Sequence, residues 1–118
     1  MKVLEIRSFI EEARKMGILR EIIGADWDLE IGAITDLNAK TKKFTLLFDE
    51  IKGYPEGYRV LTGTLLDAKR VGLALGLSPN VNDMELVNVL KEKLKYASIN
   101  YKSYKPHEVT DAPFFREC

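Results

Sequence analysis

The segment Phe44–Phe48, with the sequence Phe-Thr-Leu-Leu-Phe, constrains the fold of this chain more than any other. Its apolar side chains fall on both faces of a strand, which is typical of strands covered on both sides. We therefore expect this strand at the centre of its sheet. Residues 18–23, which stop at Gly24, and residues 58–65 also have strand character. Gly63 in the last of these segments indicates a bulge or a close backbone approach.

Four segments place apolar residues at helical spacing and supply the layers that such a sheet needs. The first predicted helix spans about residues 4–16, and the second ends near Ala39. The third lies between Asp67 and Gly76, and the fourth spans about residues 83–97. The expected buried stripe is Ala68, Val71, Ala74 and Leu75 in the third helix, and Leu86, Val87, Leu90, Leu94 and Ala97 in the fourth.

Short polar side chains predict where three of these helices begin. Asp26 or Asp28 is expected to cap the second helix, and Asp67 the third. Asn82 together with Glu85 resembles a capping box in front of the fourth.

The order of these elements predicts an α+β fold, or a compact α/β layer, with about four helices packed on a small sheet. A chain of 118 residues suits one domain. We assign residues 1–98 to that domain and residues 99–118 to an extended C-terminal tail. Pro106 and Pro113 prevent a long helix in the tail.

Charge and cysteine content argue against several classes of protein. The chain has 18 basic and 18 acidic side chains, which removes the usual electrostatic argument for nucleic acid or an anionic membrane. Its single cysteine, Cys118, cannot form an internal disulfide. No apolar run approaches the ~20 residues of a membrane helix. The expectation is a soluble cytoplasmic protein.

Few residues are candidates for catalysis or metal binding. His107 is the only histidine, and it lies in the proline-flanked tail, so we interpret it as an exposed loop residue rather than a general base. Asp26, Asp28 and Glu30 could supply oxygen ligands to a hard metal ion, but their spacing fits no calcium loop and helix capping explains them better. Cys118 has no neighbouring base that would activate a thiol.

Glycines and paired cations give no stronger signal for a phosphate site. Gly53, Gly57 and Gly63 do not form a phosphate-binding loop, and the first two are expected in a turn over residues 52–57. Lys69 and Arg70, near a helix start, could meet an anion, although a solvated pair is the expectation. We therefore assign no catalytic, cofactor-binding or metal-binding residue.

Aromatic residues are the more informative group. This group is Trp27 and the tail residues Tyr101, Tyr104, Phe114 and Phe115, and the tail residues are too apolar for a purely solvated end. The four tail residues form a possible interface. Their contact could be this domain, a second copy, or a further part of a longer chain.

Several segments, in this order and spacing, resemble the N-terminal domain of the UbiD family of prenylated-flavin-dependent decarboxylases. They are the opening helix with residues 17–19, then residues 28–35, residues 46–55 and residues 69–77. Residues 112–117 look like the strand that leads into the central domain of that family. The resemblance covers nearly the whole chain.

The resemblance implies non-oxidative decarboxylation, or the reverse carboxylation, of aromatic or α,β-unsaturated acids. It also implies prenylated flavin mononucleotide, manganese and potassium for the complete enzyme, and a homo-oligomer. The arginine, glutamates, asparagine and histidine that act in this family lie in later segments, and no position here matches them. The implied flavin-binding barrel and C-terminal domain are expected to be absent, so this chain alone is predicted to be inactive.

Two hypotheses follow for the function. The first is a scaffolding domain of a UbiD-like decarboxylase that packs against the flavin domain and helps to wall the substrate cleft. The alternative is a free-standing, non-catalytic module that binds a protein partner through its tail. A third hypothesis, a small enzyme in its own right, has no residue set to support it.

Overall fold

A computed structural model describes residues 4–111. These residues divide into two parts, one up to Leu86 and one from Val87 on. The first part contains α1 (Ile6–Lys15), β1 (Leu19–Ile23), α2 (Glu30–Thr41), β2 (Thr45–Asp49), β3 (Val60–Thr62) and α3 (Ala68–Ala74); α4 (Asp83–Asn100) and a 3₁₀ turn (Tyr101–Ser103) follow.

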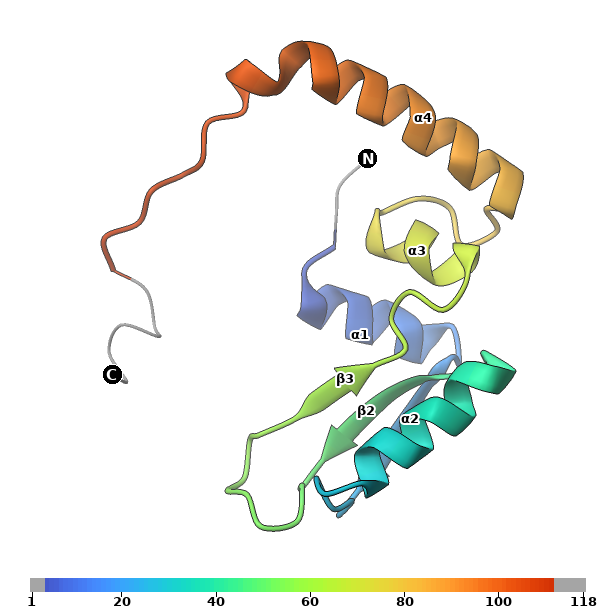
Figure 1. The fold of residues 1–118 in the computed structure, drawn as a ribbon, viewed down its shortest axis with the longest axis vertical. Coiled ribbons are helices and arrows are strands. Elements are labelled where there is room, and N and C mark those ends of the chain that lie inside the picture. The colour runs from blue at the N-terminus through green and yellow to red at the C-terminus, as the bar shows by residue number, and fades with distance from the viewer. Residues whose placement is uncertain (1–3, 112–118) are drawn as a thin grey trace. The chain divides into compact units, whose positions relative to one another are not determined.

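The three strands form one mixed sheet in the order β1-β2-β3. Figure 1 shows β2 and β3 side by side in it. β1 pairs with β2 in parallel, with Ile22 opposite Phe48. β3 pairs with β2 antiparallel, with Leu61 opposite Leu47. The predicted central position of the strand at residues 44–48 is confirmed. β3 is shorter than the strand expected over residues 58–65.

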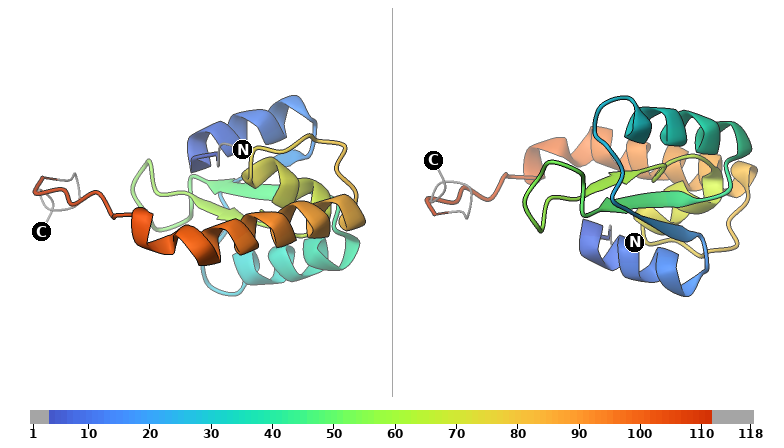
Figure 2. Two further views of the ribbon diagram at one scale, coloured as in Figure 1. Left: turned by 90° about the horizontal axis from the view of Figure 1, so that it is seen from above. Right: turned by 90° about the horizontal axis from the view of Figure 1, so that it is seen from below.

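Helices cover both faces of the sheet: α1 lies on one face and α2 on the other (Figure 2). Under α2 the buried residues are Ala25, Leu46, Phe48 and Ile51. On the other face, α1 contributes Phe9 and Ala13 and α3 contributes Leu73 to a second buried cluster, against which Leu19 and Leu61 of the sheet pack. Each large apolar side chain buried in this way stabilises the fold by about 1.5–3 kcal/mol. The predicted fold class, a small sheet with packed helices, is confirmed.

The start of α2 differs from the expected Asp cap. Leu29 occupies the N-cap position with a positive φ of 64°, and its side chain makes no capping hydrogen bond. The carboxylate of Asp26 instead accepts from the N–H of Asp28 at 3.0 Å, and the carboxylate of Glu30 accepts from the N–H of Asp26 at 2.7 Å. These carboxylates therefore order the loop before α2 rather than its first turn.

Asp67 caps α3 as predicted, since its Oδ1 accepts from the N–H of Arg70 at 2.9 Å. The stripe expected to be buried on this helix is only partly so, although Ala74 does pack against the buried cluster. Arg70, Gly72 and Leu73 are buried, whereas Ala68, Val71, Ala74 and Leu75 are only half-buried. Arg70, which we expected to be solvated with Lys69, is 2% exposed.

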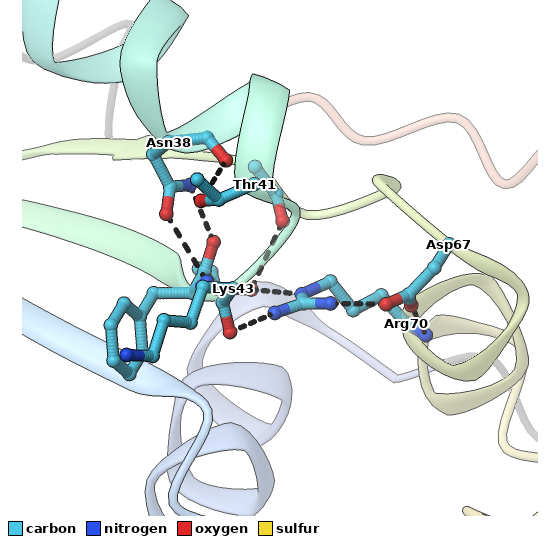
Figure 3. A network of polar contacts seen from close by, with 8 residues as sticks. Asn38, Thr41, Lys43, Asp67 and Arg70 are labelled. Carbon is cyan, nitrogen blue, oxygen red and sulfur yellow. Dashed lines mark hydrogen bonds and ion pairs between the residues drawn. The ribbon is translucent and has the colours of Figure 1, made fainter.

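A polar network around Arg70 joins α3 to the sheet (Figure 3). Its guanidinium donates to the carboxylate of Asp67, to Oγ1 of Thr45 at 3.1 Å and to the carbonyl of Lys43 at 2.9 Å. Oγ1 of Thr45 in turn donates to the carbonyl of Gly63 at 3.0 Å. The network thus fixes the position of Gly63, the residue that follows β3.

Gly63 has the close backbone approach that the sequence predicted. Its φ is +71°, a conformation that side chains disfavour, and a Cβ there would lie 3.1 Å from the carbonyl oxygen of Phe44.

The second part consists of α4 from Val87 on and the segment after it. The predicted capping box at the start of α4 is confirmed: Asn82 Oδ1 accepts from the N–H of Glu85 at 2.9 Å, and Glu85 accepts from the N–H of Asn82 at 3.1 Å. The helix runs to Asn100, beyond the expected end near Ala97. Its expected core face is buried only at Leu86, whereas Leu90 and Ala97 are half-buried, and Val87 and Leu94 are exposed at 58% and 68%.

The chain after the 3₁₀ turn has no helix or strand from residue 104 to residue 111. The sequence predicted an extended tail from Ile99 on. In the structure the helix and the 3₁₀ turn continue to Ser103, and the chain without regular structure begins at Tyr104. Within residues 4–111, no helix has the length and apolar character to cross a membrane.

Candidate functional site

The carboxyl ends of β1 and β2 lie side by side because these strands are parallel. In sheets with parallel strands, ligand sites commonly form at this edge, from the loops that follow the strands. Here backbone hydrogen bonds tie the two loops together: Gly24 N–H donates to Asp49 O at 3.1 Å, and Lys52 N–H donates to Ala25 O at 3.0 Å. An ion pair of 3.5 Å between Lys52 Nζ and Asp26 Oδ2 also connects the two loops.

A cleft of about 240 Å³ opens among these loops, α2 and β3. Its lining is aromatic and aliphatic with one cation, a composition that suits binding of an apolar group. Trp27 and Tyr58 are each 60% exposed and Tyr54 is 49% exposed, so large apolar surfaces face solvent. We call this site the aromatic cleft; it is lined by Trp27, Ile31, Ile51, Tyr54, Tyr58, Arg59 and Val60.

The turn between β2 and β3 positions the two tyrosines. Gly53 and Gly57 take positive φ angles of 83° and 96°, which confirms the turn predicted at residues 52–57. The N–H of Tyr54 donates to Ile51 O at 3.0 Å. The rings of Tyr54 and Tyr58 are then 6.0 Å apart between centroids, within the range of favourable aromatic pairs.

A second hollow of about 310 Å³ lies on the α1 face of the sheet. Its lining is almost wholly apolar, and Ile6 and Leu65 in it are 69% and 63% exposed. We call it the α1-side groove; it is lined by Leu4, Ile6, Phe9, Leu61, Thr64, Leu65 and Ala74.

Charged side chains on α1 form ion pairs outside both hollows, within the helix and with Glu21 of β1. The hydrogen bond from Arg14 to Glu21, and then the bond from Arg14 to Glu11, raise the pKa of the Arg14 guanidinium. The hydrogen bond to Glu12 raises the pKa of Lys15. All of these groups are exposed, so we interpret the pairs as ordinary surface ion pairs of small energetic value.

The residues considered for chemistry in the sequence do not converge. His107 lies exposed in the segment after the 3₁₀ turn. Asp26, Asp28 and Glu30 hydrogen-bond within their own loop, and among residues 4–111 no group of three or more His, Cys, Asp or Glu is placed to hold a metal ion.

The predicted interface residues divide between described and undescribed parts of the chain. Tyr101 and Tyr104 are 63% and 59% exposed, as a docking surface requires. Phe114, Phe115 and Cys118 lie outside the described residues. The interface itself stays a prediction.

Sequence reasoning identified Trp27 but missed Tyr54 and Tyr58. Both tyrosines flank the predicted turn in the sequence Gly-Tyr-Pro-Glu-Gly-Tyr at residues 53–58. Two aromatic residues at the ends of a glycine-rich turn were the available signal, because such a turn presents its flanking side chains at one edge of the sheet.

The residues that line the aromatic cleft include no carboxylate, histidine, serine or cysteine. These two hollows also fit a flavin phosphate poorly, because Arg59 is the one cation among the residues that line them.

Two solved structures are similar to this chain, both of the vanillic acid decarboxylase of Sedimentibacter hydroxybenzoicus in open form. The one with a truncated ShVdcD gives a TM-score of 0.72 and 24% identity, over 80% of this chain and 21% of that chain. The other gives a TM-score of 0.70 and 25% identity, over 79% of this chain and 20% of that one. This chain therefore spans about a fifth of their length.

No curated protein matches the chain. The model of one family, described as the 3-octaprenyl-4-hydroxybenzoate carboxy-lyase N-terminal domain, matches residues 10–94. These residues contain α2, all three strands, α3 and the turn that forms the aromatic cleft. The resemblance drawn from the sequence is thus confirmed, and the chain belongs to the UbiD N-terminal domain family.

Proposed function

We propose that this chain is the N-terminal, non-catalytic part of a UbiD-like decarboxylase that acts on aromatic or α,β-unsaturated carboxylic acids in the cytoplasm. The family match over residues 10–94 carries the proposal. Similar structures come from a decarboxylase about five times as long as the matched region, which leaves ample chain for a separate catalytic part.

The role of this domain in that enzyme is scaffolding. It packs against the flavin-binding part and helps to wall the substrate cleft, while the flavin-binding part supplies the reacting groups. Prenylated flavin mononucleotide, manganese and potassium are assigned to that part. The lining of the two hollows supports a packing role, since it offers mainly apolar contact surface.

The second partner of the proposal is a further copy of the enzyme, in a homo-oligomer. Tyr101 and Tyr104 are exposed and follow α4 in the chain. We assign them to the contact with the flavin-binding part.

Complementation tests the proposed function. The S. hydroxybenzoicus decarboxylase is made without the segment that this chain matches, loaded with prenylated flavin and manganese, and mixed with this chain. Release of CO₂ from vanillic acid by the mixture, and not by either component alone, is the expected result. Failure of this chain to associate with the truncated enzyme, or decarboxylation by this chain alone, would contradict the proposal.

The alternative is a free-standing module that binds a protein partner without taking part in an enzyme. The exposed aromatic surface at Trp27, Tyr54 and Tyr58 favours it, because such patches commonly mark interaction sites. The sequence of the gene beyond codon 118 distinguishes the two functions. An in-frame continuation or an adjacent flavin-domain gene supports the decarboxylase, and the absence of both supports the module.

A further inference from the structure

β3 is an edge strand with open backbone groups. Thr45 N–H donates to Ile18 O and Gly24 N–H donates to Asp49 O, so residues 45 and 49 of β2 direct their backbone groups towards β1. Because these groups alternate along a strand, Leu46 and Phe48 direct theirs towards β3. The backbone N–H and C=O groups of their partners Thr62 and Val60 therefore point towards β2. Leu61 lies between these two residues, and its N–H and C=O point away from the sheet.

Within residues 4–111, no strand pairs with this outer side of β3. An unpaired edge of this kind is a template for another extended segment, and proteins usually cover or blunt it. β3 carries no lysine or proline that would do so.

The two hollows of the domain flank the same edge on opposite faces of the sheet. Val60 lines the aromatic cleft on the α2 face, and Leu61 lines the α1-side groove. Consecutive side chains of a strand point to opposite faces, so a strand added beside β3 would direct alternate side chains into the two hollows. A helix laid against this edge could fill only one of them.

We propose that β3 accepts an extended segment from the rest of the enzyme as a fourth strand, whose alternate apolar side chains occupy the aromatic cleft and the α1-side groove. This inference rests on the proposed function. The similar decarboxylase chains extend far beyond the matched fifth, so the enzyme has polypeptide available for such a segment.

A second copy of this chain is a poorer occupant. Paired through its own β3, it would present a strand of only Val60–Thr62, whose side chains already belong to its own two hollows and to a contact with Thr35. The flanking Arg59 and Gly63 offer no alternating apolar residues to extend the pairing.

Peptide binding tests the site directly. Overlapping peptides of about twelve residues, long enough for a strand of common length, are tiled over the part of the S. hydroxybenzoicus decarboxylase that this chain does not match. At least one peptide with alternating apolar residues should bind. Tyr58→Asp in the aromatic cleft and Ile6→Asp in the α1-side groove should each weaken the affinity for this peptide by about tenfold or more. Each substitution places a charge against apolar side chains of the bound peptide.

Leu37→Asp is the matched control, because Leu37 is 64% exposed on α2 and lines neither hollow. It should change the dissociation constant less than about twofold, as surface changes away from a site usually do. Circular dichroism of the three variants confirms that each remains folded.

The backbone readout is hydrogen exchange at the amide of Leu61. In the peptide complex this amide should exchange about tenfold more slowly or better, because a strand hydrogen bond now protects it. No binding peptide, an unchanged Leu61 amide, or equal weakening by Leu37→Asp would overturn the fourth-strand proposal. Complementation with the truncated decarboxylase would still decide the proposed function separately.

Discussion

Nε of Arg70 in α3 donates to Oγ1 of Thr45 in β2 at 3.1 Å, and both side chains are buried. This contact joins residues that are far apart in the sequence. Through Thr45 it reaches the carbonyl of Gly63, so one guanidinium holds α3, the start of β2 and the end of β3 together.

We predict that Arg70→Met destabilises the domain by about 3 kcal/mol, because Oγ1 of Thr45 and the Lys43 carbonyl lose the guanidinium donor. The Asp67 carboxylate keeps only the backbone N–H of residue 70. Urea denaturation measures the change in the free energy of unfolding. Arg70→Lys should recover only part of the loss, since an ammonium group lacks the planar fork of donors.

The control for this prediction is the neighbouring cation. Lys69 is exposed, so Lys69→Met should change the unfolding free energy by less than about 0.5 kcal/mol. Equal effects of Lys69→Met and Arg70→Met would show that the network contributes nothing beyond an ordinary surface charge.

Leu47→Asp should unfold the domain. Leu47 is 3% exposed in the central strand, and burial of an unpaired carboxylate costs several kcal/mol out of a total stability of about 5–15 kcal/mol. Leu37→Asp, at an exposed position of α2, should stay folded. Thermal unfolding followed by circular dichroism compares the two, and a near-normal melting temperature for Leu47→Asp would mean that β2 is not an inner strand.

Gly72→Ala should destabilise the domain by about 1–3 kcal/mol through overpacking. A Cβ on Gly72 would lie 2.4 Å from Cγ1 of Val81, and the β-branched valine has little freedom to move aside. The double variant Gly72→Ala with Val81→Ala removes the clash and should recover most of the stability. Additive losses in this double-mutant cycle would show that the two residues do not meet in solution.

Leu46, Leu47 and Phe48 show what the sequence can predict here. Their apolar run specified an inner strand because burial on both faces leaves a local signature. Capping by Asp67 and by Asn82 with Glu85 was predictable for the same reason, since each bond joins residues three apart.

Arg70 and the tyrosines show where the sequence fails. Arginine is normally exposed, and only the distant acceptors at Thr45 and Lys43 make its burial possible. Tyr54 and Tyr58 join Trp27 in one cleft because two loops meet at the end of the sheet, which no local pattern encodes. Leu29 at the N-cap of α2 was unpredictable because a leucine with positive φ contradicts its own preference.

The final prediction concerns the chain after α4. Tyr96 and Tyr104 are almost equally exposed, at 60% and 59%, but Tyr96 lies within α4 and Tyr104 follows the 3₁₀ turn. Cleavage of a native chain requires local opening, so chymotrypsin should cut after Tyr104 about tenfold faster than after Tyr96. Mass spectrometry of timed digests measures both rates, and trypsin after Lys102 gives an independent site. The flavin-binding part should suppress the early cuts if Tyr101 and Tyr104 dock there. Equal cleavage rates at Tyr96 and Tyr104 in a monomer would contradict this prediction, because the tail would then be as protected as the helix. The aromatic residues of the tail would in that case pack on this domain and not on a partner.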